Sequence, residues 1–203
     1  MRGALVVAQV AISVILVVGA ALMTQSFVRQ MRVDLGFKPD HVVAVRFTIS
    51  GSQAGPDGQL ANHIRALLSQ VRATPGVTAA GATKALPFRG NGEPATLTIQ
   101  GAANTEGGLS SVMVMHVTDG YFGAMGIPVL AGREFGSGDA GGRALVILAN
   151  QAFLKRYFPA ETPVTAIGKR LVTARVEVEI IGVVGDVRQT SVTEPAEPTL
   201  YIS

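Results

Sequence analysis

The chain has 203 residues, 48% of them hydrophobic, and it contains no cysteine, which excludes disulfide bonds and thiolate chemistry. Its formal net charge is +3. Three of the 17 basic residues, Arg2, Arg29 and Arg32, flank the first apolar segment, and so does one of the 14 acidic residues, Asp34. Residues 38–203 therefore carry 14 basic and 13 acidic side chains. Residues 38–203 thus have a net charge of +1, which is too small to neutralise the phosphates of a nucleic acid, so a nucleic-acid partner is not expected.

The first predicted element is a membrane-spanning helix. Gly3–Val28 contains no charged residue, and about twenty helical residues span the roughly 30 Å hydrocarbon core of a bilayer. A cleaved secretion signal is the alternative, but its apolar region has only about 7–15 residues. The longer segment here, followed by Arg29 and Arg32, favours a retained anchor. The charges on its two sides do not decide the orientation.

Three positions interrupt the apolar segment with polar or small residues. Gln9 and Ser13 are four residues apart and therefore share one face of the helix, with Gly19 and Ala20 nearby. Small and polar residues permit close approach and hydrogen bonding between membrane helices. We therefore predict that Gln9, Ser13 and Gly19 pack against other transmembrane helices.

The next segment predicts a strand–helix–strand unit. Apolar residues alternate along His41–Ser50, which indicates a strand. A helix follows, with an N-cap at Asp57 and apolar residues on one face between Leu60 and Val71. Pro75 and Gly76 end this helix. The extended, small-residue segment Val77–Ala85 completes the unit.

The rest of the chain mixes strands with two short helices. One helix is expected at Asp119–Met125, ended by Gly126, and another after Asn150, which can cap it. The predicted strands are Ala95–Gln100, Ser110–Thr118, Pro128–Phe135, Ala144–Ala149, Arg170–Ala174, Arg175–Val187 and Leu200–Ile202. Strands and helices are intermixed, and several strand pairs resemble hairpins, among them Arg170–Ala174 with Arg175–Val187. We therefore predict an α+β fold with a mixed sheet in two small lobes, not a doubly wound parallel sheet.

No pattern in the sequence points to catalysis, to a metal or to a nucleotide. The three histidines have no metal-ligand spacing. Gly168-Lys169 lacks the remaining residues of a phosphate-binding loop, and the glycine turn at Gly182–Asp186 lacks dinucleotide-binding spacing. Glu177 and Glu179 lie two residues apart, on the solvent face of a strand. We therefore predict no catalytic residue, no cofactor, no metal and no ATP binding by this chain.

Several short motifs nevertheless follow one another in an order similar to that found in a known protein family. Each is a turn or cap signal, and together they extend over nearly the whole chain. The residues that carry the resemblance include Gly36, Phe37, Pro75, Gly76, Tyr121, Phe122, Gly126, Gly132, Arg133, Gly182, Gly185 and Asp186. In this order they resemble the extracytoplasmic core domain of MacB-like and FtsX-like ABC transporter permeases, in particular the acidobacterial duplicated orphan permeases.

The resemblance implies a domain organisation. Residues 1–36 form a transmembrane helix and its flank, and residues 37–203 form the core domain, which lies in the periplasm, outside the bacterial inner membrane. Its lobes are expected at 40–88 plus 175–203 and at 89–174. Further membrane helices are expected after Ser203, so that the chain is part of a longer permease.

The resemblance also implies a function and a set of partners. The domain couples ATP hydrolysis by a cytoplasmic ABC ATPase to movement outside the membrane, in efflux or mechanotransmission, and is not an enzyme. Its partners are membrane lipid, the ATPase, further permease helices or a second permease copy, and a periplasmic adaptor or lipoprotein. The alternative is a membrane-anchored periplasmic binding protein or hydrolase that is complete in itself.

Overall fold

The computed structural model describes residues 2–31, 33–47, 59–90, 92–97, 99, 110–136, 138–139, 145–172 and 176–203. It divides into two compact units, Met1–Asp34 and Leu35–Ser203, which are taken separately below. The predicted Asp57 cap and the glycine-rich connection at 101–109 lie outside the described residues.

The first unit is a single long helix, α1 (Arg2–Met31). Its 26-residue segment Val6–Met31 is long and apolar enough to cross a membrane, and at about 1.5 Å per residue it exceeds the roughly 30 Å of the hydrocarbon core. The hydroxyls of Ser13 and Thr24 donate to the carbonyl oxygens of Gln9 and Ala20, each at 2.9 Å. These polar side chains therefore cost little inside a bilayer, because their hydroxyl hydrogens are already bonded.

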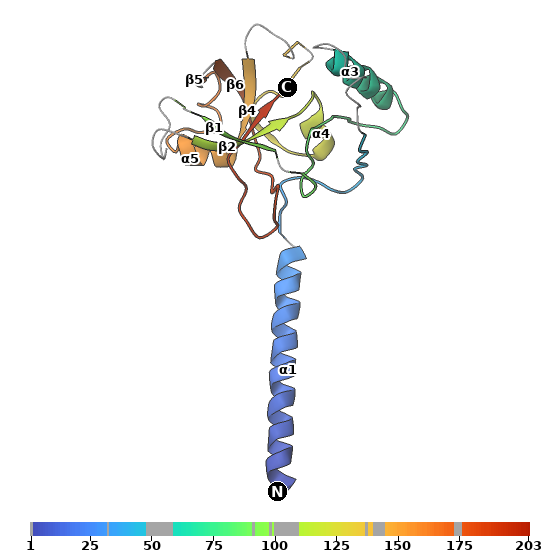
Figure 1. The fold of residues 1–203 in the computed structure, drawn as a ribbon, viewed down its shortest axis with the longest axis vertical. Coiled ribbons are helices and arrows are strands. Elements are labelled where there is room, and N and C mark those ends of the chain that lie inside the picture. The colour runs from blue at the N-terminus through green and yellow to red at the C-terminus, as the bar shows by residue number, and fades with distance from the viewer. Residues whose placement is uncertain are drawn as a thin grey trace. The chain divides into compact units, whose positions relative to one another are not determined.

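The second unit is built on a mixed sheet, as predicted (Figure 1). Among the described residues it has seven strands, in the order β1-β2-β7-β4-β6-β3, with β5 paired to β6. The pairs β2·β7 and β4·β6 are parallel, and the other pairs are antiparallel. The strands are β1 (Glu93–Leu97), β2 (Ser110–His116), β3 (Val129–Gly132), β4 (Leu145–Asn150), β5 (Arg170–Val172), β6 (Glu177–Val184) and β7 (Thr199–Ile202).

A hydrophobic core covers each face of this sheet. Side chains alternate between faces along a strand, so Ile147 and Ala149 of β4 enter one core and Leu148 enters the other. Helix α5 (Gln151–Tyr157) contributes to the first core, and helix α4 (Tyr121–Met125) contributes to the second. The centre of the sheet is therefore buried on both faces.

Both predicted short helices are present, although α4 begins at Tyr121 and not at the predicted Asp119. Gly126 ends α4 in the left-handed region, with φ of 63°. The Asn150 side chain accepts the Phe153 N–H at 2.9 Å and so caps α5. The strands predicted at Arg170–Ala174 and Arg175–Val187 pair with each other in their described parts, as the antiparallel strands β5 and β6.

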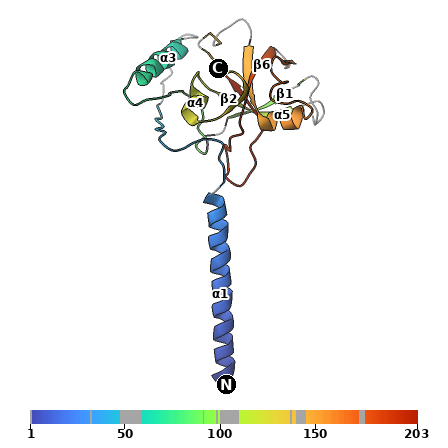
Figure 2. The same cartoon turned by 180° about the vertical axis from the view of Figure 1, so that it is seen from behind.

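The predicted strand–helix–strand unit is wrong in both of its strands. Its helix is present as α3 (Gln59–Arg72), on the opposite side of the domain from α5 in both views (Figure 1 and Figure 2). The described part of His41–Ser50 contains no strand, and Val43 is 86% exposed there. Alternation alone does not form a strand where no sheet edge accepts its hydrogen bonds.

The segment Val77–Ala85 likewise forms only one isolated bridge, from Thr83 to Val117. Two further backbone hydrogen bonds reach it, from the Thr118 N–H to the Ala82 carbonyl at 2.9 Å and from the Lys84 N–H to the His116 carbonyl at 3.2 Å, and side chains bond it as well. Arg72 donates twice to the Ala80 carbonyl, at 3.1 and 2.8 Å, and the Ala82 N–H donates to the Thr118 hydroxyl at 2.8 Å. Since these partners are 8 to 36 residues away in the sequence, the local pattern did not reveal the outcome.

Candidate functional site

The candidate site is the short segment that follows helix α1 in the sequence. This segment, Leu35–Lys38, is called the coupling segment below. The Leu35 carbonyl accepts a hydrogen bond from the Arg188 N–H at 3.0 Å, and the Lys38 N–H donates to the Met125 carbonyl at 2.9 Å. The coupling segment is therefore fixed at both ends to the folded domain.

Gly36 makes the tightest contact of the coupling segment. Its φ is +79°, in the left-handed region that glycine adopts without a steric cost. A Cβ atom at this position would lie 1.8 Å from the Asp186 carbonyl oxygen and 2.8 Å from the Asp186 carbonyl carbon. The predicted motif residues Gly36 and Asp186 thus meet backbone to backbone, at a separation that excludes any side chain.

Phe37 anchors the coupling segment by packing. Its side chain packs against the core that contains α4, and its ring lies 6.3 Å from the ring of Phe88. The Phe88 N–H donates to the Gln189 carbonyl at 2.8 Å. Phe88 therefore ties Phe37 to the same stretch of chain that contacts Leu35 and Gly36.

Lys38 crosses the end of α4 beside Gly126. A Cβ atom on Gly126 would lie 3.0 to 3.1 Å from the aliphatic carbons of the Lys38 side chain. Gly126 therefore has two roles, since it ends α4 with a positive φ and leaves room for Lys38.

The residues that accept the coupling segment are Gly185–Gln189, called the receiving segment below. The Gly185 N–H donates to the Pro128 carbonyl at 2.9 Å, and a Cβ on Gly185 would lie 2.9 Å from the Pro128 ring. The Asp186 carboxylate accepts the Ala152 N–H of α5 at 2.7 Å, and Lys155 lies 3.7 Å from it. The receiving segment is thereby held against both α5 and the start of β3.

The other motif residues lie apart from this site. Gly132, with φ of +74°, and Gly182 permit β3 and β6 to approach closely, because a Cβ on Gly132 would lie 2.2 Å from the Ile181 carbonyl oxygen. Gly76 follows α3 with φ of +89° and has no atom within 4 Å of a built Cβ, and Pro75 precedes it. Tyr121 and Phe122 are buried in the core behind the site.

Arg133 forms an ion pair with Asp139. Its guanidinium donates to the two carboxylate oxygens at 2.6 and 2.9 Å, and the Gly136 N–H donates to the same carboxylate at 2.7 Å. These hydrogen bonds, with that of Arg133 the stronger, lower the pKa of Asp139 to about 2. The pair closes the turn after β3 and has a local, structural role.

The structure brings together five of the residues named from the sequence: Gly36, Phe37, Gly126, Gly185 and Asp186. Sequence reasoning missed Phe88, Arg188 and Gln189, which complete the site. Phe88 has a positive φ of 61°, which is uncommon for a bulky residue and marks it as held by its surroundings. No residue pattern around these three positions signals that role, since their contacts are made with distant parts of the chain.

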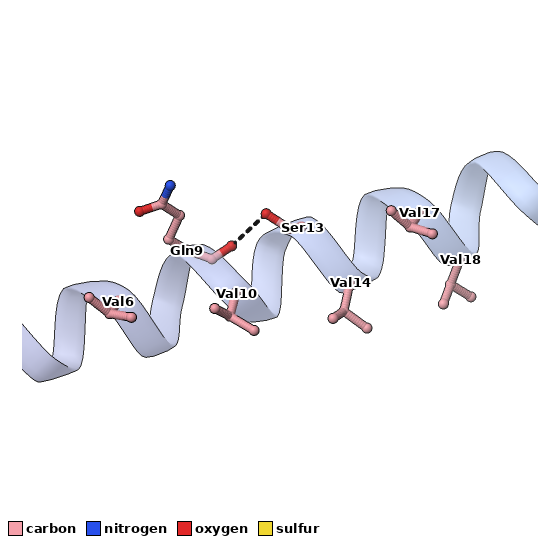
Figure 3. A pocket seen from close by; sticks show the side chains of 7 residues that line it. All are labelled: Val6, Gln9, Val10, Ser13, Val14, Val17 and Val18. Carbon is pink, nitrogen blue, oxygen red and sulfur yellow. Dashed lines mark hydrogen bonds between the residues drawn. The ribbon is translucent and has the colours of Figure 1, made fainter.

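A second candidate site is a groove along α1 (Figure 3). The Gln9 carboxamide points away from the helix and has no hydrogen-bond partner among the described residues, whereas Ser13 is bonded to the Gln9 carbonyl. Gly19 is not among the residues of this groove. The groove is lined by Val6, Gln9, Val10, Ser13, Val14, Val17 and Val18.

Within the described residues, no group of three His, Asp or Glu side chains is close enough together to hold a metal ion. Glu177 and Glu179 lie on β6, where Val178 and Ile180 between and beside them are buried in the core. Of the two carboxylates predicted to face solvent, Glu177 is exposed and Glu179 is half-buried.

Comparison with known proteins identifies a family. The family model of the MacB-like periplasmic core domain matches residues 4–203. The comparison with curated proteins found no match.

Several solved structures are similar to the chain. One is the periplasmic region of MacB from Actinobacillus actinomycetemcomitans, with 16% identity, a TM-score of 0.46, and coverage of 68% of this chain and 53% of that one. Another is the extracellular domain of the noncanonic ABC-type transporter YknZ from Gram-positive bacteria, with 16% identity, a TM-score of 0.43, and coverage of 77% and 69%.

A third similar structure is a domain of a permease protein from Porphyromonas gingivalis, with 15% identity, a TM-score of 0.39, and coverage of 67% of this chain and 49% of that one. The chain spans about half the length of the first and third of these structures.

Proposed function

This chain belongs to the MacB-like periplasmic core domain family, and from that premise we propose that it works as the extracytoplasmic domain of an ABC transporter permease subunit, moved by a cytoplasmic ATPase. In this proposal α1 lies in the inner membrane of a bacterium, and Leu35–Ser203 lies outside the cytoplasm. Movement of α1, driven by ATP hydrolysis in the partner, displaces the domain. The displacement serves efflux or the control of a periplasmic adaptor or lipoprotein.

The observation that carries the proposal is the fixed coupling segment. Leu35 and Lys38 are hydrogen-bonded to the domain, and Gly36 is in backbone contact with Asp186. In the sequence, α1 ends at Met31, four residues before Leu35. Since each residue extends the chain by at most about 3.6 Å, the end of α1 can lie no more than about 14 Å from Leu35. A movement of α1 that would exceed this distance must therefore pull on the domain.

Inside the domain the pull is distributed to secondary structure. Asp186 lies two residues after the end of β6 and is bonded to α5, and Lys38 is bonded to the end of α4. Both cores of the sheet are therefore engaged, one through α5 and the other through α4. Close-packed cores deform little, so the domain is expected to move as a rigid body.

We also propose that the groove on α1 contacts further permease helices or a second permease copy. An unpartnered carboxamide is costly in hydrocarbon, and Gln9 recovers this free energy by hydrogen bonding to a neighbouring helix. Ser13 lies in the same groove and adds little bulk. Gly19 lies outside this groove and leaves space for a helix on its own side of α1.

The test of the proposed function is purification of the tagged chain from native membranes, with identification of the proteins that remain bound. We expect an ABC ATPase in stoichiometric amount and ATP hydrolysis by the complex. A chain that purifies without an ATPase, and that is stabilised by a small-molecule ligand or cleaves a substrate, would instead be the binding protein or hydrolase considered above.

The same preparation tests the groove on α1. We expect Gln9→Leu to reduce the amount of membrane partner retained. Among the described residues, the Gln9 carboxamide is the only polar side-chain group of the groove besides the Ser13 hydroxyl, which is already hydrogen-bonded. Ile15→Leu is the control, since Ile15 is 70% exposed and lies outside the groove. Equal retention by both variants would reject the groove and leave the proposed function standing.

A further inference from the structure

Large apolar side chains are exposed shortly after the coupling segment. Val43, Val45 and Phe47, called the apolar row below, are 86%, 74% and 49% exposed. They alternate along the chain with the period of two that places side chains on one face of an extended segment. Among the described residues, Val43 is the most exposed large apolar residue, those of α1 included. Exposed apolar side chains that cluster in this way mark a contact site for a protein or a membrane.

Contacts within the domain tie the apolar row to the coupling segment. The guanidinium of Arg46, which lies between Val45 and Phe47 in the sequence, donates to the Arg89 carbonyl at 3.3 Å. The residue before Arg89 is Phe88, which is itself exposed, and its ring lies 6.3 Å from that of Phe37. The row therefore belongs to the same region of the domain as the coupling segment.

Three basic side chains of this region have no carboxylate partner. Lys38, Arg46 and Arg89 are exposed, and none of them forms an ion pair among the described residues. The acidic residue between Lys38 and Phe47 is Asp40 alone, so the region is positively charged. Apolar side chains beside free cations are typical of surfaces that bind the boundary between lipid headgroups and acyl chains.

The length of the chain keeps this region close to the membrane in which the proposed function places α1. Lys38 follows the end of α1 at Met31 by seven residues, so it stays within about 25 Å of that end. The apolar row begins five residues further on, at Val43. Lipid is always present at this distance, whereas a protein partner would have to be recruited. The choice of lipid rests on the proposed function, because it requires α1 to span a membrane.

We propose that the apolar row binds the lipid surface of the membrane that α1 spans. Its three side chains enter the boundary between headgroups and acyl chains, and the three free cations contact the phosphates of anionic lipids. The domain then has two attachments to the membrane, namely α1 and the apolar row. It cannot turn freely about the coupling segment, so a movement of α1 is delivered in one orientation.

Power saturation of spin labels tests the contact, because oxygen concentrates in lipid and a nickel chelate stays in water. The full chain is placed in nanodiscs of phosphatidylethanolamine and phosphatidylglycerol. Single labels are attached at Val45→Cys in the row, at Val164→Cys, which is equally exposed elsewhere on the domain, and at Leu16→Cys in α1. We expect the labels at positions 45 and 16 to lose access to nickel and to be relaxed by oxygen. The label at position 164 is expected to remain accessible to nickel.

A charge placed in the row provides the matched variant. We expect Val43→Asp to restore access of nickel to the label at position 45, because a carboxylate is not accommodated among acyl chains and is repelled by anionic lipids. Val164→Asp is the control and is expected to leave the label at position 45 shielded from nickel. Both valines are exposed, so neither substitution is expected to change Tm.

Two results would overturn the lipid contact. One is a label at Val45→Cys that nickel reaches as readily as the label at Val164→Cys. The other is a label shielded from both reagents, since a protein partner would then cover the row. Either result, with the Leu16→Cys label in lipid and the ATPase still retained, leaves the proposed function standing. Loss of the oxygen effect at Leu16→Cys would instead reject the membrane position of α1, and with it both proposals.

Discussion

Gly36→Ala is expected to destabilise the domain by about 3–5 kcal/mol and to separate the coupling segment from the receiving segment. A left-handed backbone costs alanine about 1–2 kcal/mol. The new Cβ would also lie 1.8 Å from the Asp186 carbonyl oxygen, a contact with backbone that no rotamer change relieves. Withdrawal of the segment breaks the bonds of Leu35 and Lys38, at about 1 kcal/mol each, and exposes part of Phe37.

Gly76→Ala is the matched control for this variant. Gly76 also has a positive φ, of +89°, but no atom lies within 4 Å of a Cβ built on it. Its substitution carries only the backbone strain of about 1–2 kcal/mol. Denaturant unfolding of the full chain in detergent measures both variants. Equal losses of stability would mean that the contact between Gly36 and Asp186 contributes nothing beyond backbone conformation.

Asn150→Ala is expected to destabilise the domain by about 3–5 kcal/mol, since it leaves several buried backbone groups without partners. Asn150 is 0% exposed. Its side-chain oxygen accepts the N–H groups of Phe153 and Thr199, both at 2.9 Å, and its amide donates to the Glu197 carbonyl at 2.8 Å. One side chain therefore caps α5 and also fixes the chain where it enters β7.

Asn62→Ala provides the comparison for Asn150→Ala. Asn62 is exposed on α3, and its side-chain oxygen accepts a hydrogen bond from Arg65 at 2.8 Å. Its loss is expected to change the free energy of unfolding by less than about 0.5 kcal/mol. The same denaturant experiment measures it. A loss below about 1 kcal/mol in Asn150→Ala would show that the three buried bonds are replaced by other partners.

The sequence predicted the elements whose signals are local. The Asn150 cap depends on residues three positions apart, and the buried strand before it is a continuous apolar segment, so both could be read directly. His41–Ser50 and Val77–Ala85 carry equally regular patterns, yet neither is a strand in its described part. Strand formation needs a partner edge, and the position of that edge is a property of the whole fold.

The candidate site could be predicted only in part, for a similar reason. The resemblance to a family singled out Gly36 and Asp186 separately, but nothing in the sequence indicates that they touch. Their contact depends on where β6 ends and on how the chain re-enters the sheet at β7. Gln189 carries no motif at all, and its burial follows from the same long-range arrangement.

The central claim is that movement of α1 is transmitted through the coupling segment to the domain, and a distance measurement tests it most directly. The chain has no cysteine, so spin labels can be placed at Met31→Cys of α1 and Val164→Cys of the domain, which are 72% and 73% exposed. The distance distribution between them is recorded in the ATPase complex, before ATP is added and after trapping during hydrolysis. Because a coupled domain moves together with α1, we expect one distribution throughout the ATP cycle in the otherwise unchanged chain and with Gly76→Ala. With Gly36→Ala we expect the distribution to change on trapping, since α1 then moves without the domain. A change on trapping in the otherwise unchanged chain, or one constant distribution in Gly36→Ala, would contradict transmission through the coupling segment.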